Sequence, residues 1–218
     1  MKKNTFSLII ITSLLGLVGC NNEIKPKTLT SINPTTKQVV QNDSMDTIYT
    51  QANRIIYDNY GKIKKRADFI GIVQPLKPFA TREHVNKYGE YNSLGLFYTK
   101  TEVKVFKVFK GDIKPGTIME IIEPISIVKR NNGRISKISI DKYKELPMET
   151  PSLVFLSKNG NGQLSMSNAQ NSYFPMQKTQ TFARSGEVRA DRIVQNRKGD
   201  KIHQAIYDGI MKDGLLNK

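Results

Sequence analysis

The chain has 218 residues, and its 34 Lys and Arg against 19 Asp and Glu give a formal net charge of +15 at pH 7. With 38% hydrophobic residues and no Trp, it has material for one domain of ordinary size with a modest core. One cysteine excludes an intramolecular disulfide and a cysteine-rich metal site, and two histidines exclude a multi-histidine metal site.

The first twenty residues have the pattern of a secretory signal. Two lysines precede an uncharged, mostly apolar run that is shorter than the ~20 residues a membrane-spanning helix needs. The run ends in Leu17-Val18-Gly19-Cys20, which resembles the lipobox of bacterial lipoproteins at every position. The resemblance implies cleavage between Gly19 and Cys20 and a diacylglyceryl group on the Cys20 sulfur. We therefore expect a lipid-anchored protein on the extracytoplasmic face of the cell membrane, held in the bilayer by acylated Cys20.

Three parts are expected along the chain. Residues 1–19 form the lipoprotein signal peptide, residues 20–45 the lipidated N-terminus and a flexible tether, and residues 46–218 a single β-rich globular domain. The tether prediction rests on residues 21–43, which contain Asn, Thr, Lys and Pro without an apolar period. A coil of this length reaches roughly 25–30 Å, so the domain is expected to stand off the bilayer.

The positive charge favours anionic partners, with anionic lipid or a wall polymer as the candidates. Short basic clusters occur near residues 62–66 and 129–137, but long basic runs typical of nucleic-acid-binding arms are missing, so nucleic acid is not an expected partner. The chain is also rich in Lys, Asn and Ile, as proteins encoded by AT-rich genomes are. We favour a solvated basic surface of this compositional origin over a dedicated polyanion site.

The domain is predicted to begin with a helix and to continue in strands. Between Asp46 and Arg66 the apolar residues recur at steps of three and four, which is typical of one amphipathic helix. Residues 69–73 form a short β-type run that two prolines end, and residues 79–96 are predicted to be a long loop. His84 is therefore expected to be an exposed loop histidine.

The clearest strand covers residues 98–110. Its alternation of apolar and charged residues changes parity at Val105-Phe106, which predicts a β-bulge. Asn131-Asn132-Gly133 predicts a hairpin turn, and the run Leu153 to Leu156, which has no polar face, predicts a central strand. Strands are predicted over residues 69–73, 98–110, 117–123, 126–128, 135–140, 153–156 and 163–167.

The C-terminal segment is predicted to be helical. A narrow apolar stripe runs from Ile202 to Ile210, with Asp200 near its start and Gly214 just past its end. His203 lies beside this stripe and is expected on the helix surface.

The order of these segments resembles a domain found in many bacterial exported proteins. The matching features are Ala67-Asp68 before an apolar run, alternating valines that end in Lys110-Gly111, a Pro115-Gly116 turn, and the later apolar strand. Those domains are small OB-type barrels, similar in outline to tissue inhibitors of metalloproteinases. The resemblance covers about residues 67–177 and implies a mainly β (α+β) fold, a small antiparallel OB-like barrel with an N-terminal and a C-terminal helix. It carries no catalytic residues, and an acylated, unpaired Cys20 departs from the disulfide-held N-terminal cysteine of those inhibitors.

The sequence contains no recognisable catalytic motif. No Ser lies in a Gly-x-Ser-x-Gly elbow and no Gly-rich phosphate loop follows a strand. We therefore expect a binding or interaction module at the cell envelope that is not an enzyme and uses no cofactor or metal; the sequence identifies no protein partner. Two alternatives stay open: an envelope hydrolase with an unrecognised site, and a substrate-capturing lipoprotein of an importer, although the chain lacks an alternating βαβ pattern.

Aromatic residues supply the candidate contact residues. Loops on rigid barrels often carry function, so the aromatic residues of the predicted first long loop are the candidate contact surface. The mixed aromatic and basic run over residues 106–110 has two explanations, stacking of bases or sugars on an OB-like face and simple packing, and we favour packing. The candidate contact residues are Tyr88, Tyr91, Phe97 and Tyr98.

Overall fold

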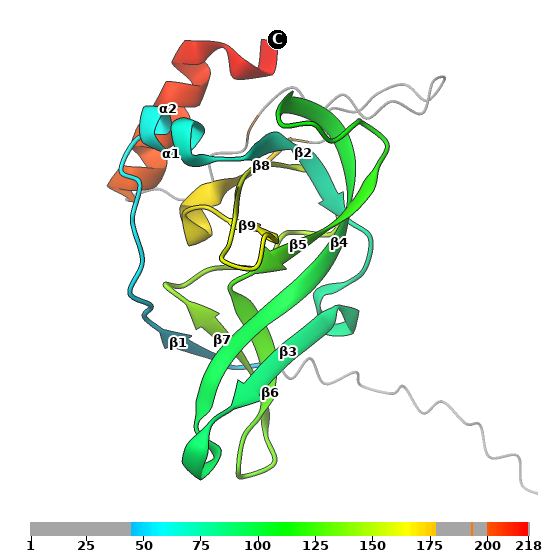
Figure 1. The fold of residues 1–218 in the computed structure, drawn as a ribbon, viewed down its shortest axis with the longest axis vertical. Coiled ribbons are helices and arrows are strands. Elements are labelled where there is room, and N and C mark those ends of the chain that lie inside the picture. Colours follow the sequence, from blue (N-terminus) through cyan, green and yellow to red (C-terminus); the bar gives the residue numbers. More distant parts are fainter. Residues whose placement is uncertain (1–44, 178–192, 194–199, 218) are drawn as a thin grey trace, which may run out of the picture. The chain divides into compact units, whose positions relative to one another are not determined.

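Within residues 45–177, five strands close into a barrel in the computed structural model of the chain (Figure 1). The structure describes residues 45–177, 193 and 200–217. β8 pairs with β2 on one side and with β9 on the other, which closes the ring. The barrel strands are β2 (Phe69–Pro75), β4 (Leu94–Lys110), β5 (Ile118–Glu123), β8 (Ser152–Lys158) and β9 (Leu164–Met166).

The strand order round the ring is β2, β4, β5, β9, β8. All of these pairs are antiparallel except β5 with β9, which is parallel at Ile122 and Ser165. A closed five-stranded ring with this order is compatible with an OB-like barrel. The predicted mainly β fold, with a small barrel and two helices, is confirmed, and so is the predicted central strand, because residues 152–157 of β8 are all buried.

The long strand β4 bends at the predicted bulge. Ile72 pairs with Lys107 and Val73 with Val105, so Phe106 is an extra residue on β4. A second register shift follows at Gly71, where a Cβ atom would lie 2.5 Å from the Lys107 carbonyl oxygen, so only glycine allows this close approach. The two bulges let one 17-residue strand serve several partners in turn.

A second sheet, made of three strands within the described residues, lies beside the barrel. β7 (Ile135–Ile140) pairs with β6 (Ile125–Lys129) across the predicted hairpin turn, and on its other side it pairs in parallel with β1 (Thr47–Thr50). The helix predicted between residues 46 and 66 is therefore wrong over most of its length. Only α1 (Tyr60–Arg66) is helical, since β7 offers the preceding segment a pairing edge that is remote in sequence.

The loop predicted over residues 79–96 is also wrong. It contains a strand, β3 (Glu83–Tyr88), which pairs with the first half of β4 to form a long hairpin, and two short 3-10 turns, η1 (Phe79–Thr81) and η2 (Glu90–Asn92). β3 shows little apolar alternation because each of its faces is only partly covered, so the period-two signal of a strand is weak.

Two apolar cores flank the wall made by β2 and β8. One fills the barrel, with Phe69, Val105 and Leu156 among its members. The other joins the outer face of the wall to α1 and to the C-terminal helix α2 (Lys201–Asp213), through Ile63, Phe155 and Ile206 among others (Figure 1). The remaining elements are η3 (Ala169–Ser172), β10 (Tyr173–Pro175), which pairs with β8, and η4 (Leu215–Asn217).

The predicted ends of the C-terminal helix are confirmed. The Asp200 side chain accepts hydrogen bonds from the Ile202 and His203 amides, and Gly214 adopts the left-handed conformation. Its histidine, however, is not on the surface: His203 is fully buried and stacks on Phe174 at 4.5 Å, because the buried stripe of α2 includes position 203.

The predicted signal peptide, lipidated cysteine and most of the tether lie outside the described residues. Among the residues that the structure describes, no helix combines the length and apolar character needed to cross a membrane.

Candidate functional site

The β3–β4 hairpin carries all four predicted contact residues. Tyr88 ends β3 and Tyr91 lies in the connecting turn, where its side chain is 99% exposed. Tyr91 and Asn92 both have φ near +57°, in the left-handed region that non-glycine residues adopt uncommonly. The turn therefore holds an aromatic side chain out in solvent, at the end of the hairpin.

Phe97 and Tyr98 cannot both share one surface with Tyr88 and Tyr91. They are consecutive residues of β4, so their side chains point to opposite faces of the hairpin. Phe97 pairs with Asn86 on the face toward β6, whereas Tyr98 pairs with Val85 on the other face. The structure thus brings two of the four candidates together at the tip and separates the other two.

Polar side chains on the inner face of the hairpin hold the edge of β6. Thr99 Oγ1 donates to the Ile125 carbonyl at 2.6 Å, and Asn86 Nδ2 donates to the Ile127 carbonyl at 2.9 Å. The Ile127 amide points to His84 Nδ1 at 3.4 Å. These side chains satisfy backbone groups of a strand edge that would otherwise be open.

His84 is therefore a half-buried strand residue, and its prediction as an exposed loop histidine is wrong. Its Nε2 lies 3.0 Å from the Phe79 carbonyl, which can only accept, so Nε2 carries a proton, and Nδ1 lies 2.9 Å from Thr99 Oγ1 and 3.4 Å from the Ile127 amide nitrogen. Burial lowers the pKa of His84, and the nearby Arg82 charge lowers it further against the opposing effect of the Phe79 carbonyl.

A buried ion pair lies under the base of the hairpin. Glu123 Oε1 accepts from Arg82 Nη1 at 2.8 Å and from Thr101 Oγ1 at 2.5 Å, and Oε2 accepts from Tyr143 Oη and the Leu146 amide, both at 2.7 Å. Burial and the Glu123 charge raise the pKa of Tyr143 well above its ordinary value. Both carboxylate oxygens are occupied by protein donors, so this cluster joins elements together and presents nothing to a substrate.

OB folds bind oligonucleotides and oligosaccharides on the face of their second and third strands, and β4 and β5 are the second and third strands of this barrel in chain order. Their outer face holds a hollow of about 160 Å³ in which acids and bases alternate. Lys77 bridges to Glu102 at 2.7 Å and Lys100 to Glu83 at 2.9 Å, and Glu102 stands opposite Glu120 across the strands. Because the charges balance locally, this face lacks the basic groove that follows a nucleic-acid backbone.

The aromatic and basic run at the end of β4 serves packing. Phe106 and Phe109 are partly buried against the core between the barrel and the helices. Lys104 and Lys107 sit over their rings, 5.7 and 5.0 Å from the ring centroids. The rings are thereby covered on one face by the core and approached on the other by lysine.

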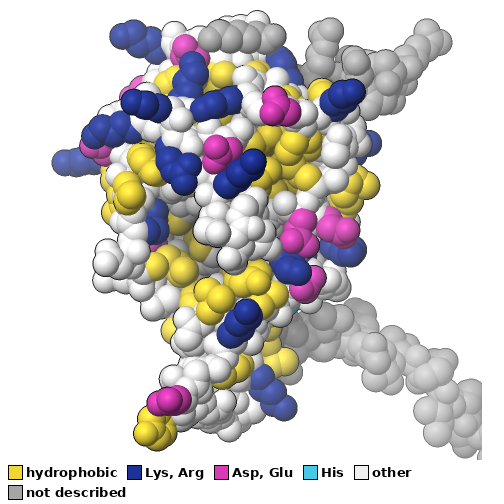
Figure 2. All heavy atoms as spheres, in the orientation of Figure 1, with side chains coloured by type: hydrophobic (Ala, Val, Ile, Leu, Met, Phe, Trp, Pro, Cys, Tyr) yellow, Lys and Arg dark blue, Asp and Glu magenta, His cyan; other side chains and the backbone are white. Residues whose placement is uncertain are grey.

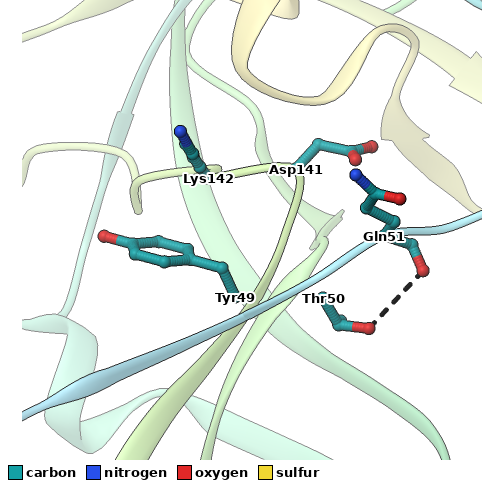
Figure 3. Close-up of a pocket in the computed structure, with 5 residues that line it drawn as sticks. All are labelled: Tyr49, Thr50, Gln51, Asp141 and Lys142. Atoms are coloured by element: carbon teal, nitrogen blue, oxygen red, sulfur yellow. Dashed lines mark hydrogen bonds between the residues drawn. The ribbon is translucent and has the colours of Figure 1, made fainter.

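A hollow of about 450 Å³ lies beside β1 (Figure 3). It is lined by Tyr49, Thr50, Gln51, Asp141 and Lys142. Figure 3 shows Tyr49 and Lys142 directed away from Asp141 and Gln51, so the polar groups do not converge on a common point. Asp141 is also engaged by Arg54 at 2.6 Å. The hollow therefore lacks the convergent polar groups of a specific small-molecule site.

Among the described residues, no three His, Cys, Asp or Glu side chains are grouped so as to hold a metal ion. Comparison with known proteins finds no matching family model and no matching curated protein. Tyr91, in the turn of the β3–β4 hairpin, is the most exposed large apolar residue among those that the structure describes, and Tyr88 and Leu96 near it are each 48% exposed. We take this hairpin tip, residues 88–96, as the candidate contact site.

Proposed function

We propose that the chain is a membrane-anchored extracytoplasmic lipoprotein whose barrel domain acts as a non-catalytic binding module at the cell envelope. The observation that carries the proposal is the sequence Leu17-Val18-Gly19-Cys20 at the end of a charged and then apolar leader. The barrel supports it in one respect. Its buried ionisable cluster is occupied by internal hydrogen bonds, whereas Tyr91, its most exposed aromatic residue among those described, stands on a projecting hairpin.

The alternatives draw less support from the described residues. A hydrolase using histidine would need a ring nitrogen open to a substrate, and both ring nitrogens of His84 face protein atoms. An importer's capturing lipoprotein usually closes two lobes on its substrate, and the described residues form one barrel with its covering elements. Neither alternative has an observation of its own in its favour.

Anchoring is tested by expressing the full chain in a bacterial host and following it by fractionation and intact-mass spectrometry. The expected result is a membrane-bound form that begins at residue 20 and carries the mass of a diacylglyceryl group. Cys20→Ser is expected to abolish the lipid mass and to leave the precursor uncleaved or the protein released. Asn21→Ser, which leaves the lipobox intact, serves as the matched control and is expected to behave as the wild type. A membrane-bound, correctly cleaved Cys20→Ser protein contradicts the proposal.

A further inference from the structure

Two loops project from the same end of the described domain. One is the hairpin tip, residues 88–96, and the other is the β6–β7 turn, residues 130–134 (Figure 1). They are held in fixed relation because the inner face of the β3–β4 hairpin hydrogen-bonds the edge of β6, through Asn86 to the Ile127 carbonyl among others. We call these two loops, together with the flanking strand residues Lys87, Lys129 and Ile135, the hairpin end.

The hairpin end combines exposed apolar and basic side chains. Tyr91 is 99% exposed, Ile135 next to the β6–β7 turn is 56% exposed, and Tyr88 and Leu96 are each 48% exposed. Figure 2 shows apolar, basic and acidic side chains close together at the lower end of the molecule, where the hairpins of Figure 1 project. The exposed charged residues on the two hairpins here are Lys87, Glu90, Lys129 and Arg134.

Positive charge prevails on this end. Three exposed bases stand against the single acid Glu90 on the same two hairpin segments, residues 87–96 and 129–135. The other acid near the turn, Asp46, is already bridged to Arg130 at 2.7 Å. An apolar tip with basic neighbours has the composition of a surface that enters a lipid headgroup layer, because Tyr has an apolar ring and a polar hydroxyl and Lys and Arg attract anionic lipids.

The polypeptide enters the domain at this same end. Asp46, the second described residue, accepts from Ser136 at 2.8 Å and from Arg130, and its carbonyl accepts from the Lys137 amide. Asp46 is thereby fixed at the base of the β6–β7 turn. Any chain that leads from a lipidated Cys20 must reach the domain here, and the expected reach of that segment is only roughly 25–30 Å.

We propose that the hairpin end docks on the anionic lipid surface of the membrane in which the protein is anchored, with Tyr91 in the headgroup layer and Lys129 and Arg134 against lipid phosphates. The orientation rests on the proposed function, since the anchor determines which membrane is within reach. A soluble anionic polymer fits this end less well, because it offers no apolar layer to the exposed Tyr and Ile side chains.

The absence of Trp from the sequence makes a direct test possible. In the mature chain, residues 20–218 with Cys20→Ser, Tyr91→Trp places a single fluorophore at the tip, and Met211→Trp places one at a half-exposed position of α2. With phosphatidylglycerol vesicles, Tyr91→Trp is expected to shift its emission to shorter wavelength and to be quenched by brominated acyl chains. Met211→Trp is expected to do neither. The proposal is overturned if Met211→Trp shows the emission shift and quenching and Tyr91→Trp does not. It is also overturned if neither variant shows them.

Charge variants test the basic half of the surface. Lys129→Gln with Arg134→Gln is expected to weaken binding to phosphatidylglycerol vesicles by about fivefold for each charge removed. The matched control, Lys65→Gln with Lys212→Gln, removes two bases from α1 and α2 and is expected to leave binding within about twofold of wild type. Equal losses in the two pairs would show a non-directional effect of net charge and would overturn the docking orientation.

The two proposals fail in different ways. Loss of anchoring is read from the mass and fractionation of the full chain, whereas loss of docking is read from vesicles and an unlipidated protein. If the full chain is lipidated and membrane-bound but the unlipidated Tyr91→Trp variant does not respond to vesicles, the docking proposal is overturned and the anchoring proposal stands. Binding of wall polymer by the hairpin end without any response to vesicles also overturns the docking proposal.

Discussion

Arg82 and Glu123 form a salt bridge at 2.8 Å whose side chains are 2% and 0% exposed. Arg82 also donates through Nε to the Lys77 carbonyl at 3.0 Å and through Nη2 to the Leu146 carbonyl at 2.9 Å. The pair thus ties the start of the β3–β4 hairpin to β5 and to the segment that follows β7. Because both residues have several protein partners, the pair links these segments structurally. Removal of either residue leaves the other one buried and charged without its counterion.

Breaking this pair is expected to be costly. Glu123→Gln is predicted to lower the free energy of unfolding by about 3–5 kcal/mol, because Arg82 stays buried and charged. In the double variant that also carries Arg82→Met, the total loss of stability is predicted to be clearly smaller than the sum of the two single losses, because the buried charge without a counterion is then gone. Urea unfolding of the two single variants and the double variant, followed by circular dichroism, measures this coupling.

An exposed pair on the same barrel provides the control. Lys77 and Glu102 lie 2.7 Å apart with side chains 57% and 49% exposed. The cycle of Lys77→Met and Glu102→Gln is expected to give a coupling of less than ~1 kcal/mol. Coupling energies of equal size in the two cycles would contradict the role assigned to the buried pair.

Acid is expected to loosen the attachment of the β3–β4 hairpin. The pKa of His84 is lowered in the fold from its ordinary value of 6.5, so the unfolded chain binds more protons than the folded one in the range just below 6.5. The contribution of His84 to stability is therefore complete above pH 6.5 and is lost as the pH falls through that value toward the folded pKa. Burial and the nearby Arg82 charge oppose protonation of the ring, whereas the Phe79 carbonyl favours it.

This pH dependence is measured from urea midpoints between about pH 8 and about pH 5. At the upper end of this pH range, His84→Gln is predicted to be less stable than the wild type. On acidification it is predicted to lose less stability than the wild type does. His203 is the other histidine in the sequence, so the difference between the wild-type and His84→Gln curves isolates the share of His84. Parallel curves would show that His84 does not titrate in this way.

The contact of α1 with α2 is predicted to depend on Gly209. A Cβ atom there would lie 2.3 Å from Tyr60 Cβ, so Gly209→Ala forces the two helices apart and is expected to cost about 1–3 kcal/mol despite the better helix propensity of Ala. Gly61→Ala is the matched control on α1, because the nearest atom to its Cβ is 3.5 Å away. Thermal unfolding is expected to show a clear drop for the first variant and no drop for the second.

Local chemistry made much of the fold predictable. The bulge at Phe106 follows from a change of parity that a twofold side-chain alternation makes visible. The β6–β7 hairpin follows from Asn132-Gly133, where Gly133 takes a positive φ, and the ends of α2 follow from Asp200 and Gly214. In each case the residues that decide the structure are neighbours in sequence. The lipidation of Cys20 also rests on a local sequence pattern, and it stays a prediction.

Contacts between distant segments decided the rest. β1 and β3 lack strong patterns of their own and became strands because β7 and β4 present edges to them. His84 and His203 are held inside by elements far away in sequence, Ile127 of β6 and Phe174 of β10.

Part of the candidate contact site was likewise predictable from local sequence, and part was decided by contacts between distant segments. The sequence by itself pointed to Tyr88 and Tyr91, whose exposure follows from a turn between two strands. It grouped Phe97 with Tyr98, although neighbours on a strand point to opposite faces. Only the tertiary structure placed the β6–β7 turn and the entry of the chain at Asp46 beside the hairpin, because hydrogen bonds to the edge of β6 and to Arg130 join segments that lie tens of residues apart.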